Sequence, residues 1–273
     1  LRLHGPEGAP LIGDLAAVKE EIKLDYSNMQ ISSIPSTMTK LKRLCFLHLN
    51  GNQITYLPDS FAGLCSLEFL SLEHNQLESL PPSLSELKKL NILMLNSNRL
   101  SKFPKVICKM YKLLSLEIAD NGLEALPSSI KRLVNLERLF AWRNALVKLP
   151  SAIGELVKLQ TLNVSQNHLR KLPDSLPKLT ALRTLNLSSQ RCWTGEPLDE
   201  YVAPYDDPRW EYTLLELDSV CDLSGTLRSL DLSFCGLKKL PADFVRLRAK
   251  LDFLNLNDNS KWLDKYMAQD ASA

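Results

Sequence analysis

The residues that could carry chemistry are few and scattered. The four histidines do not show the short spacings that hold zinc; they are His4, His48, His74 and His168. The six cysteines form neither a C-x-x-C nor a C-x-C pair; they are Cys45, Cys65, Cys108, Cys192, Cys221 and Cys235. The sequence contains no G-x-x-x-x-G-K-[ST] phosphate loop and no G-x-S-x-G elbow. These patterns favour no cofactor and no metal.

One nucleophilic arrangement is conceivable. Cys45 lies three residues before His48, and His48 and His74 both fall where a strand would face solvent. The alternative, which we favour, is that polar residues simply occupy exposed strand positions, as is common in repeat proteins. We therefore predict that this chain is not an enzyme.

The net charge and the cysteine spacing limit the class of partner and the cellular compartment. The formal charge of +2 does not nominate nucleic acid or membrane as a partner. No apolar run approaches 18 residues, so no membrane span is expected. The cysteines are dispersed rather than clustered at the ends of the chain, which favours a reduced, intracellular and cytoplasmic location.

A repeat must position all of these side chains. A leucine returns every 23 residues, at Leu44, Leu67, Leu90, Leu113, Leu136, Leu159 and Leu182. A well-formed unit reads Leu67-x-x-Leu70-x-Leu72-x-x-Asn75-x-Leu77-x-x-Leu80-Pro81. Self-similarity at this period indicates a solenoid, in which each unit buries its apolar residues against its neighbours.

Each unit, numbered from its first leucine, has a strand followed by a short helical segment. Positions 3 to 8 alternate as a strand does, Asn at position 9 ends the strand, and Pro at position 15 opens the turn into the helical segment. Strands need about 4.8 Å each and helical segments about 8–10 Å. We therefore predict an α/β solenoid, with a concave parallel β-sheet and short helices or 3-10 turns on the convex side.

We expect one solenoid domain over residues 1–273. Residues 1–20 form a partial or capping repeat, 21–190 regular repeats, 191–226 an irregular insertion with a restored helix, 227–259 the last repeats, and 260–273 a C-terminal cap or tail. The helix is expected where apolar spacing resumes, at Leu214, Leu217, Val220 and Leu223. Gln190 replaces the usual Asn where the rhythm breaks.

The pattern Leu-Pro-x-x-(Ile/Leu)-x-x-Leu-x-x-Leu-x-x-Leu-x-Leu-x-x-Asn-x-Leu resembles the intracellular 23-residue class of leucine-rich repeats. That class includes Ras-suppressor and Ras-scaffold proteins and plant intracellular Ras-group proteins. The stretch from Leu149-Pro150 to Leu159 is especially similar. The resemblance covers residues 21–190 and 227–259. It implies a protein-binding scaffold, connected in many relatives to small GTPases, kinases or phosphatases.

The outward strand positions are the candidate binding residues. Large apolar side chains on a face that the architecture exposes, together with charged neighbours, are typical of interfaces. The predicted concave site contains Phe46, Phe69, Ile92, Met94, Glu117, Phe140, Trp142 and Arg143. The alternative is that these residues only pack against their cross-strand neighbours.

Two further features could contact a partner. The insertion contains Trp193, Tyr205 and Trp210, which either form a binding flap or pack on the solenoid flank. Basic residues precede several strands, at Lys42, Arg43, Lys88, Lys89, Lys112, Lys131, Arg132 and Lys158. We interpret them as solvated surface, the alternative being a steering surface for an acidic partner or anionic lipid.

The function predicted from the sequence is a non-enzymatic intracellular scaffold that binds a protein partner on its concave face, without cofactor. The first alternative is the targeting region of a larger kinase, cyclase or ubiquitin ligase, because the chain begins inside a repeat. The second is a structural subunit of a large assembly. Nucleic-acid binding ranks below these three.

Overall fold

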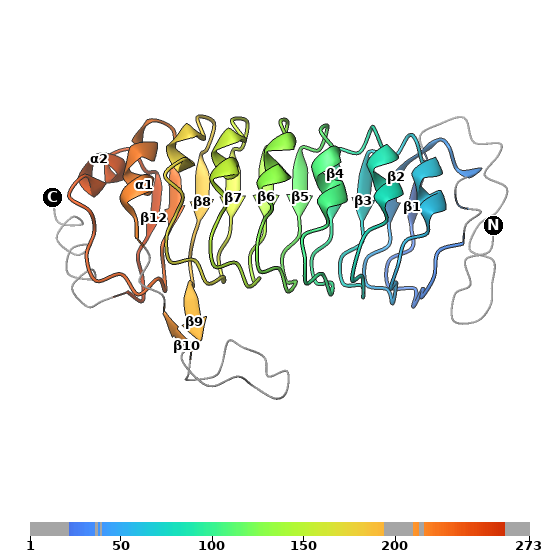
Figure 1. The fold of residues 1–273 in the computed structure, drawn as a ribbon, viewed down its shortest axis with the longest axis horizontal. Helices are drawn as coiled ribbons and strands as arrows, with labels where there is room; N and C mark the ends of the chain where they lie inside the picture. Colours follow the sequence, from blue (N-terminus) through green and yellow to red (C-terminus); the bar gives the residue numbers. More distant parts are fainter. Residues whose placement is uncertain (1–21, 36–37, 39, 194–209, 213–215, 260–273) are drawn as a thin grey trace.

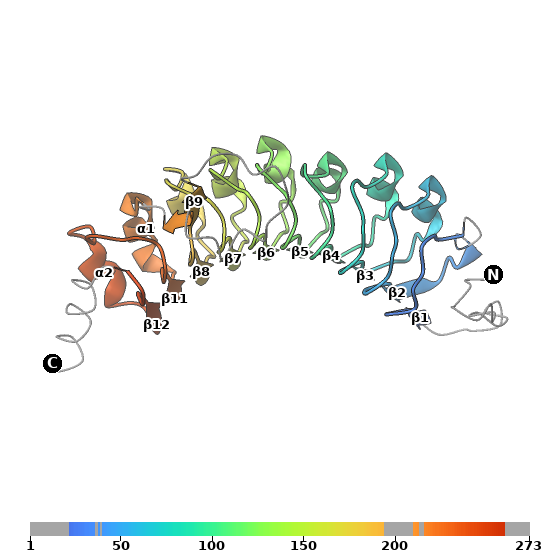
Figure 2. The same cartoon turned by 90° about the horizontal axis from the view of Figure 1, so that it is seen from below.

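The computed structural model describes residues 22–35, 38, 40–193, 210–212 and 216–259. Ten of its strands form one parallel sheet in the order β1-β2-β3-β4-β5-β6-β7-β8-β11-β12 (Figure 1). The strands are β1 (Ile22–Asp25), β2 (Leu44–His48), β3 (Phe69–Ser71), β4 (Ile92–Met94), β5 (Ser115–Glu117), β6 (Arg138–Phe140), β7 (Thr161–Asn163), β8 (Thr184–Asn186), β11 (Ser229–Asp231) and β12 (Phe253–Asn255). Figure 2 shows that these strands follow an arc and line its inner side.

One short 3-10 helix per repeat covers the outer side of the arc. These helices are η3 (Asp59–Gly63), η4 (Pro82–Glu86), η5 (Lys105–Lys109), η6 (Ser128–Arg132), η7 (Ser151–Glu155) and η8 (Leu176–Lys178). The apolar residues of this segment recur every three residues, as in Phe61, Leu64 and Leu67. The N–H of each donates to the carbonyl three residues earlier, which is the 3-10 pattern. The predicted α/β solenoid with a concave parallel sheet and convex 3-10 turns is confirmed.

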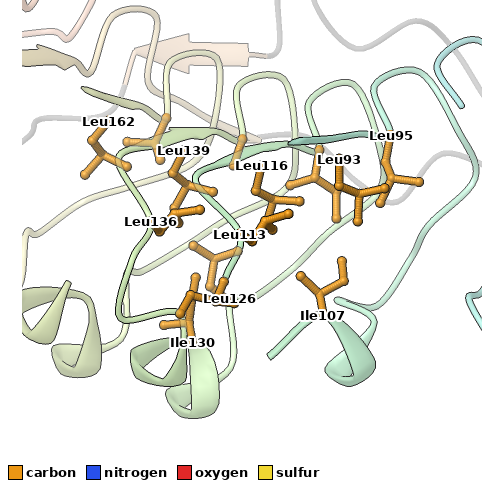
Figure 3. Close-up of a cluster of buried hydrophobic side chains, with 14 of the residues drawn as sticks. Leu93, Leu95, Ile107, Leu113, Leu116, Leu126, Ile130, Leu136, Leu139 and Leu162 are labelled. Atoms are coloured by element: carbon orange, nitrogen blue, oxygen red, sulfur yellow. The ribbon is translucent and has the colours of Figure 1, made fainter. Parts of the chain in front are cut away.

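The core runs continuously between the sheet and the helices, from Tyr26 to Leu256. Figure 3 shows its middle, where strand leucines such as Leu116 and Leu139 meet helical residues such as Ile130. All three of these side chains are fully buried. Burying one such side chain contributes about 1.5–3 kcal/mol, so stacking of repeats is the main source of stability.

Buried Asn and Gln side chains at the ends of the strands form a ladder of hydrogen bonds between adjacent repeats. Asn167 donates to the carbonyls of Ala141 and Val164, each at 3.0 Å, and accepts from the N–H of Leu146 at 3.0 Å. The Asn side chain thus satisfies backbone groups of its own repeat and of the preceding one. Gln190 does the same with Val164, Leu187 and Leu169, so the ladder continues through this substitution.

The residue before each ladder position has a positive φ, which turns the chain out of the strand. These residues are Gly51, His74, Ser97, Asp120, Arg143, Gln166, Ser189, Phe234 and Asp258, with φ between +50° and +69°. The left-handed conformation costs of order 1 kcal/mol or more for a residue with a side chain. The hydrogen bonds of the neighbouring amide hold the turn in place.

The chain leaves the solenoid after Gln190 and later rejoins it. Strand β8 pairs directly with β11, while β9 (Arg191–Trp193) and β10 (Trp210–Tyr212) form an antiparallel hairpin below the sheet in Figure 1. The outer side is then completed by α1 (Asp218–Cys221), η9 (Asp222–Gly225) and α2 (Phe244–Arg248). Leu217, Val220 and Leu223 are buried there, whereas Leu214 lies outside the described residues.

The expected terminal caps, residues 1–20 and 260–273, also lie outside the described residues. Within the part that is described, no helix is long and apolar enough to span a bilayer.

Candidate protein-binding face

Parallel pairing brings the outward residues of β2 to β6 into two rows on the concave face. The first row contains Phe46, Phe69, Ile92, Ser115 and Arg138, and the second contains His48, Ser71, Met94, Glu117 and Phe140. Because the register is shared, each member of a row is a direct cross-strand neighbour of the next. The candidate residues from Phe46 to Phe140 therefore lie on one face of the sheet, with the buried Ser71 and Ser115 between them.

The N-terminal end of this surface is an aromatic cluster. The rings of Phe46 and Phe69 lie 6.3 Å apart, and the ring of His48 lies 4.7 Å from that of Phe69. The Lys23 Nζ sits 4.6 Å from the centre of the Phe46 ring, within the range of a cation–π interaction. Both phenylalanines are half-buried, so cross-strand packing and an available surface coexist. The 23-residue step from Lys23 to Phe46 could have identified this contact from sequence.

The centre of the surface is a shared amide between two carboxylates. Asn96, which is buried, donates to Glu73 at 2.6 Å and to Glu117 at 2.8 Å. Its carbonyl oxygen accepts the N–H of Ala119 at 2.8 Å, so the amide is fixed. Burial raises the pKa of Glu117; the hydrogen bond from Asn96 opposes this rise, and the nearby Glu73 charge adds to it. Sequence reasoning selected Glu117 but missed Asn96 and Glu73.

The C-terminal end contains the predicted aromatic and arginine anchor. Arg143 pairs with Asp120 through Nε at 3.1 Å, and Ser97 also donates to Asp120 at 2.8 Å. Phe140 and Trp142 are half-buried on adjacent outward positions of the same repeat. The ion pair with Asp120 therefore restrains the exposed Arg143 side chain, which follows Phe140 and Trp142 in the same repeat.

The concave face of the later repeats satisfies its own hydrogen bonds. Asn163 accepts from both the backbone N–H and the hydroxyl of Ser165, and Asn186 does the same with Ser188. Asp231 repeats the arrangement with Ser233. Polar groups paired within their own strand gain little from a partner. The contrast separates the face formed by β2–β6 from that formed by β7, β8 and β11.

The insertion residues are placed only in part. The backbones of Trp193 and Trp210 are directly opposite each other in the β9–β10 hairpin. Their side chains, and Tyr205 as a whole, lie outside the described residues. A partner contact by these three residues stays a prediction.

The conceivable Cys45–His48 pairing has no support in the geometry. The buried Cys45 thiol donates to the carbonyl of Arg43 at 3.5 Å, whereas the His48 ring lies against Phe69. Within the described ranges, no three His, Cys, Asp or Glu side chains gather in a way that could hold a metal ion. The face offers apolar area and fixed charges, which are features of protein-binding surfaces.

Comparisons with known proteins agree with the repeat. Two family models described as leucine-rich repeat match the chain, one over residues 20–77 and the other over residues 158–179 and 226–247. A search of curated proteins found no match.

Several solved structures share the fold. A leucine-rich-repeat protein of Leptospira interrogans is 26% identical, with a TM-score of 0.74. The match covers 90% of this chain and 57% of the Leptospira chain. A TDR receptor is 27% identical, with a TM-score of 0.66. The match covers 89% of this chain and 44% of the receptor chain. The plant peptide hormone receptor RGFR1, in complex with RGF2, shows the fold alone at 23% identity, with a TM-score of 0.58 and coverage of 84% and 38%.

This chain spans between 38% and 57% of the length of these three proteins. Leucine-rich-repeat proteins are typically binding scaffolds without enzymatic activity. The chain therefore has the fold of a leucine-rich-repeat solenoid, and residues 20–77, 158–179 and 226–247 match leucine-rich-repeat family models.

Proposed function

We propose that this protein is a non-enzymatic interaction scaffold that binds a protein partner on the concave face of β2–β6. The binding surface consists of the aromatic cluster at Phe46 and Phe69, the Asn96-centred carboxylates, and the anchor at Phe140, Trp142 and Arg143. Ile92 and Met94 link these parts through the rows of the sheet.

One observation carries the proposal, namely the contrast along a single sheet. Strands β7, β8 and β11 place short polar side chains outward and pair them locally, whereas Phe253 of β12 is again a large, exposed outward residue. The earlier strands place Phe, Trp and Met outward, half-buried and beside fixed charges. Aromatic, Met and Arg side chains are enriched at interfaces and carry most of the binding energy there. A sheet that needed only cross-strand packing would not require this change along its length.

The cellular compartment and the class of partner are also proposals. The resemblance to intracellular 23-residue repeats supports a cytoplasmic protein whose partner is a small GTPase, or a kinase or phosphatase of a signalling pathway. Among the described residues, Cys65, Cys108 and Cys235 carry reduced thiols, as a reducing compartment would leave them. The insertion residues Trp193, Tyr205 and Trp210 are proposed as an additional contact.

The test is affinity purification of the full chain with identification of bound proteins by mass spectrometry. Trp142→Ala and Phe140→Ala variants are compared with wild type and with Thr184→Ala, a matched change on the polar half of the same face. Circular dichroism confirms that each variant is folded. We expect Trp142→Ala and Phe140→Ala to lose a partner that Thr184→Ala retains. Equal recovery by all variants would overturn the concave-face proposal.

A further inference from the structure

The rim at which the strands begin carries a concentrated positive charge. It comprises positions 19–23 of seven successive repeats, residues 40–43, 62–66, 85–89, 108–112, 131–135, 154–158 and 177–181. These residues include eleven Lys or Arg side chains and two Glu side chains, whereas the whole chain has a formal charge of only +2. The basic residues are Lys40, Lys42, Arg43, Lys88, Lys89, Lys109, Lys112, Lys131, Arg132, Lys158 and Lys178, and all are exposed.

Little of this charge is neutralised locally. Glu86 lies 3.5 Å from Lys88, and Glu155 lies 3.5 Å from Lys131. These are exposed pairs, which hold their partners only weakly. Within the described part of the chain, no acidic side chain lies within 4 Å of Lys89 or Lys112. The charge of the rim is therefore available to an anionic surface.

Three exposed apolar side chains run through the middle of the same rim. Tyr111, Val134 and Val157 occupy position 22 of consecutive repeats, and each is about half exposed, at 49%, 51% and 51%. They stand beside Lys112 and Lys158. The two valines offer a nucleic acid little, because its binding relies on charge and aromatic stacking, whereas the boundary region of a bilayer accepts all three side chains.

The shape of the rim suits a flat partner. The repeats follow an arc that lies in the plane of Figure 2, so equivalent positions of one rim face the same direction. The recess among Lys88, Lys109 and Tyr111 has no room for a water molecule, whereas Lys109 and Lys178 each also line a larger recess between neighbouring repeats. The hairpin β9–β10 leaves from the opposite rim, where the strands end (Figure 1). A protein partner would ordinarily need a recess or a matched contour.

We propose that this basic rim docks the solenoid on an anionic lipid bilayer, with the lysines at the headgroups and Tyr111, Val134 and Val157 dipping into the boundary region. Docking on this rim leaves the concave face open to the side, where a protein partner could reach it. The rim and the concave face share none of the residues invoked for either, so the two proposals stand independently.

The test is co-sedimentation of the full chain with vesicles. One set consists of phosphatidylcholine, and the other contains about one-third phosphatidylserine. We expect binding only to the anionic vesicles, and weaker binding as salt rises. Each lysine near a charged bilayer is worth roughly a fivefold change in partitioning, so Lys89→Gln with Lys112→Gln should lower partitioning by an order of magnitude or more.

Two matched variants make the result specific. Lys102→Gln with Lys148→Gln removes the same charge from position 13 of two repeats, outside the rim, where both lysines are exposed, and should change partitioning less than twofold. Val134→Ser with Val157→Ser keeps the charge and should lower partitioning severalfold. The proposal is overturned if wild type does not bind anionic vesicles, if the position-13 variant weakens binding equally, or if the valine variant binds like wild type. The last result would leave an acidic protein or nucleic acid as the partner.

Discussion

At the scale of single residues, surroundings decide which chemical groups are available. Burial raises the pKa of the Cys235 thiol to about 12 and raises the pKa of the Cys108 thiol as well. Cys235 donates to the carbonyl of Leu187 at 3.1 Å, so the thiol serves as a hydrogen-bond donor in the core. Cys65, in contrast, is exposed. Sequence spacing shows that no pair of cysteines is motif-like, but only the fold separates the exposed thiol from the buried ones.

We therefore predict selective thiol labelling of the native protein. Cys65 should react with a thiol reagent at neutral pH within minutes, because it is exposed, whereas Cys235 should not react until the protein unfolds. Cys65→Ser should remove one fast-reacting equivalent, and Cys235→Ser should leave the fast count unchanged. Titration with a chromogenic disulfide reagent measures both. Rapid labelling of Cys235 in the native state would contradict its assigned burial.

Glu117 allows a prediction about pH. Because the folded state raises its pKa, folding favours the protonated carboxyl, and its ionisation lowers stability as pH rises through the carboxyl range. Glu117→Gln keeps an oxygen to accept from Asn96 and removes the charge. The variant should have a modestly higher melting temperature than wild type at pH 7, and the difference should shrink at pH 3. Thermal unfolding followed by circular dichroism measures this. A variant less stable than wild type at pH 7 would contradict the assignment.

At the scale of elements, the amide ladder shows how far sequence reasoning reaches. The recurring Asn predicts a strand end, and the structure places an amide there in every repeat from Asn52 to Gln190, whereas the first repeat has Met29. The role of Gln190 could not be predicted, because its extra methylene is accommodated by geometry that only the fold reveals. Cys235 takes the same position after the chain has left the solenoid into β9 at Arg191. The preceding repeat then follows another course, and the Cys235 thiol donates to the carbonyls of Leu187 and Ser233 in place of an amide.

Removal of a ladder amide should be costly. Asn167 has no exposed surface, and Asn167→Ala would leave the N–H of Leu146 and several carbonyls without their partner. We expect a loss of about 3 kcal/mol in the free energy of unfolding, since each buried unsatisfied group costs about 1–3 kcal/mol. Denaturant titration measures it. Gln160→Ala, at an exposed site, should cost less than about 0.5 kcal/mol. Equal costs for the two variants would refute the role of the ladder.

At the scale of the whole molecule, the 23-residue period predicts the sheet, its register and its curvature, because identical units can stack in only one way. The period also identifies Phe46, Phe140 and Trp142 as outward residues. It cannot show which outward side chains satisfy one another. The Glu73–Asn96–Glu117 group and the paired Asn and Ser residues of the later strands depend on distances across repeats. Those distances, rather than residue types alone, distinguish the face of β2–β6 from that of β7, β8 and β11.

The central claim is that the face of β2–β6 binds a protein partner, and the most direct test is an affinity measurement with the partner that affinity purification identifies. Isothermal titration calorimetry of wild type, Trp142→Ala and Thr184→Ala compares the two halves of the face. We predict that Trp142→Ala weakens binding by at least about 30-fold, the effect of a hot-spot residue worth about 2 kcal/mol, and that Thr184→Ala changes it less than twofold. An unchanged affinity for Trp142→Ala, or a greater loss for Thr184→Ala, would contradict the account.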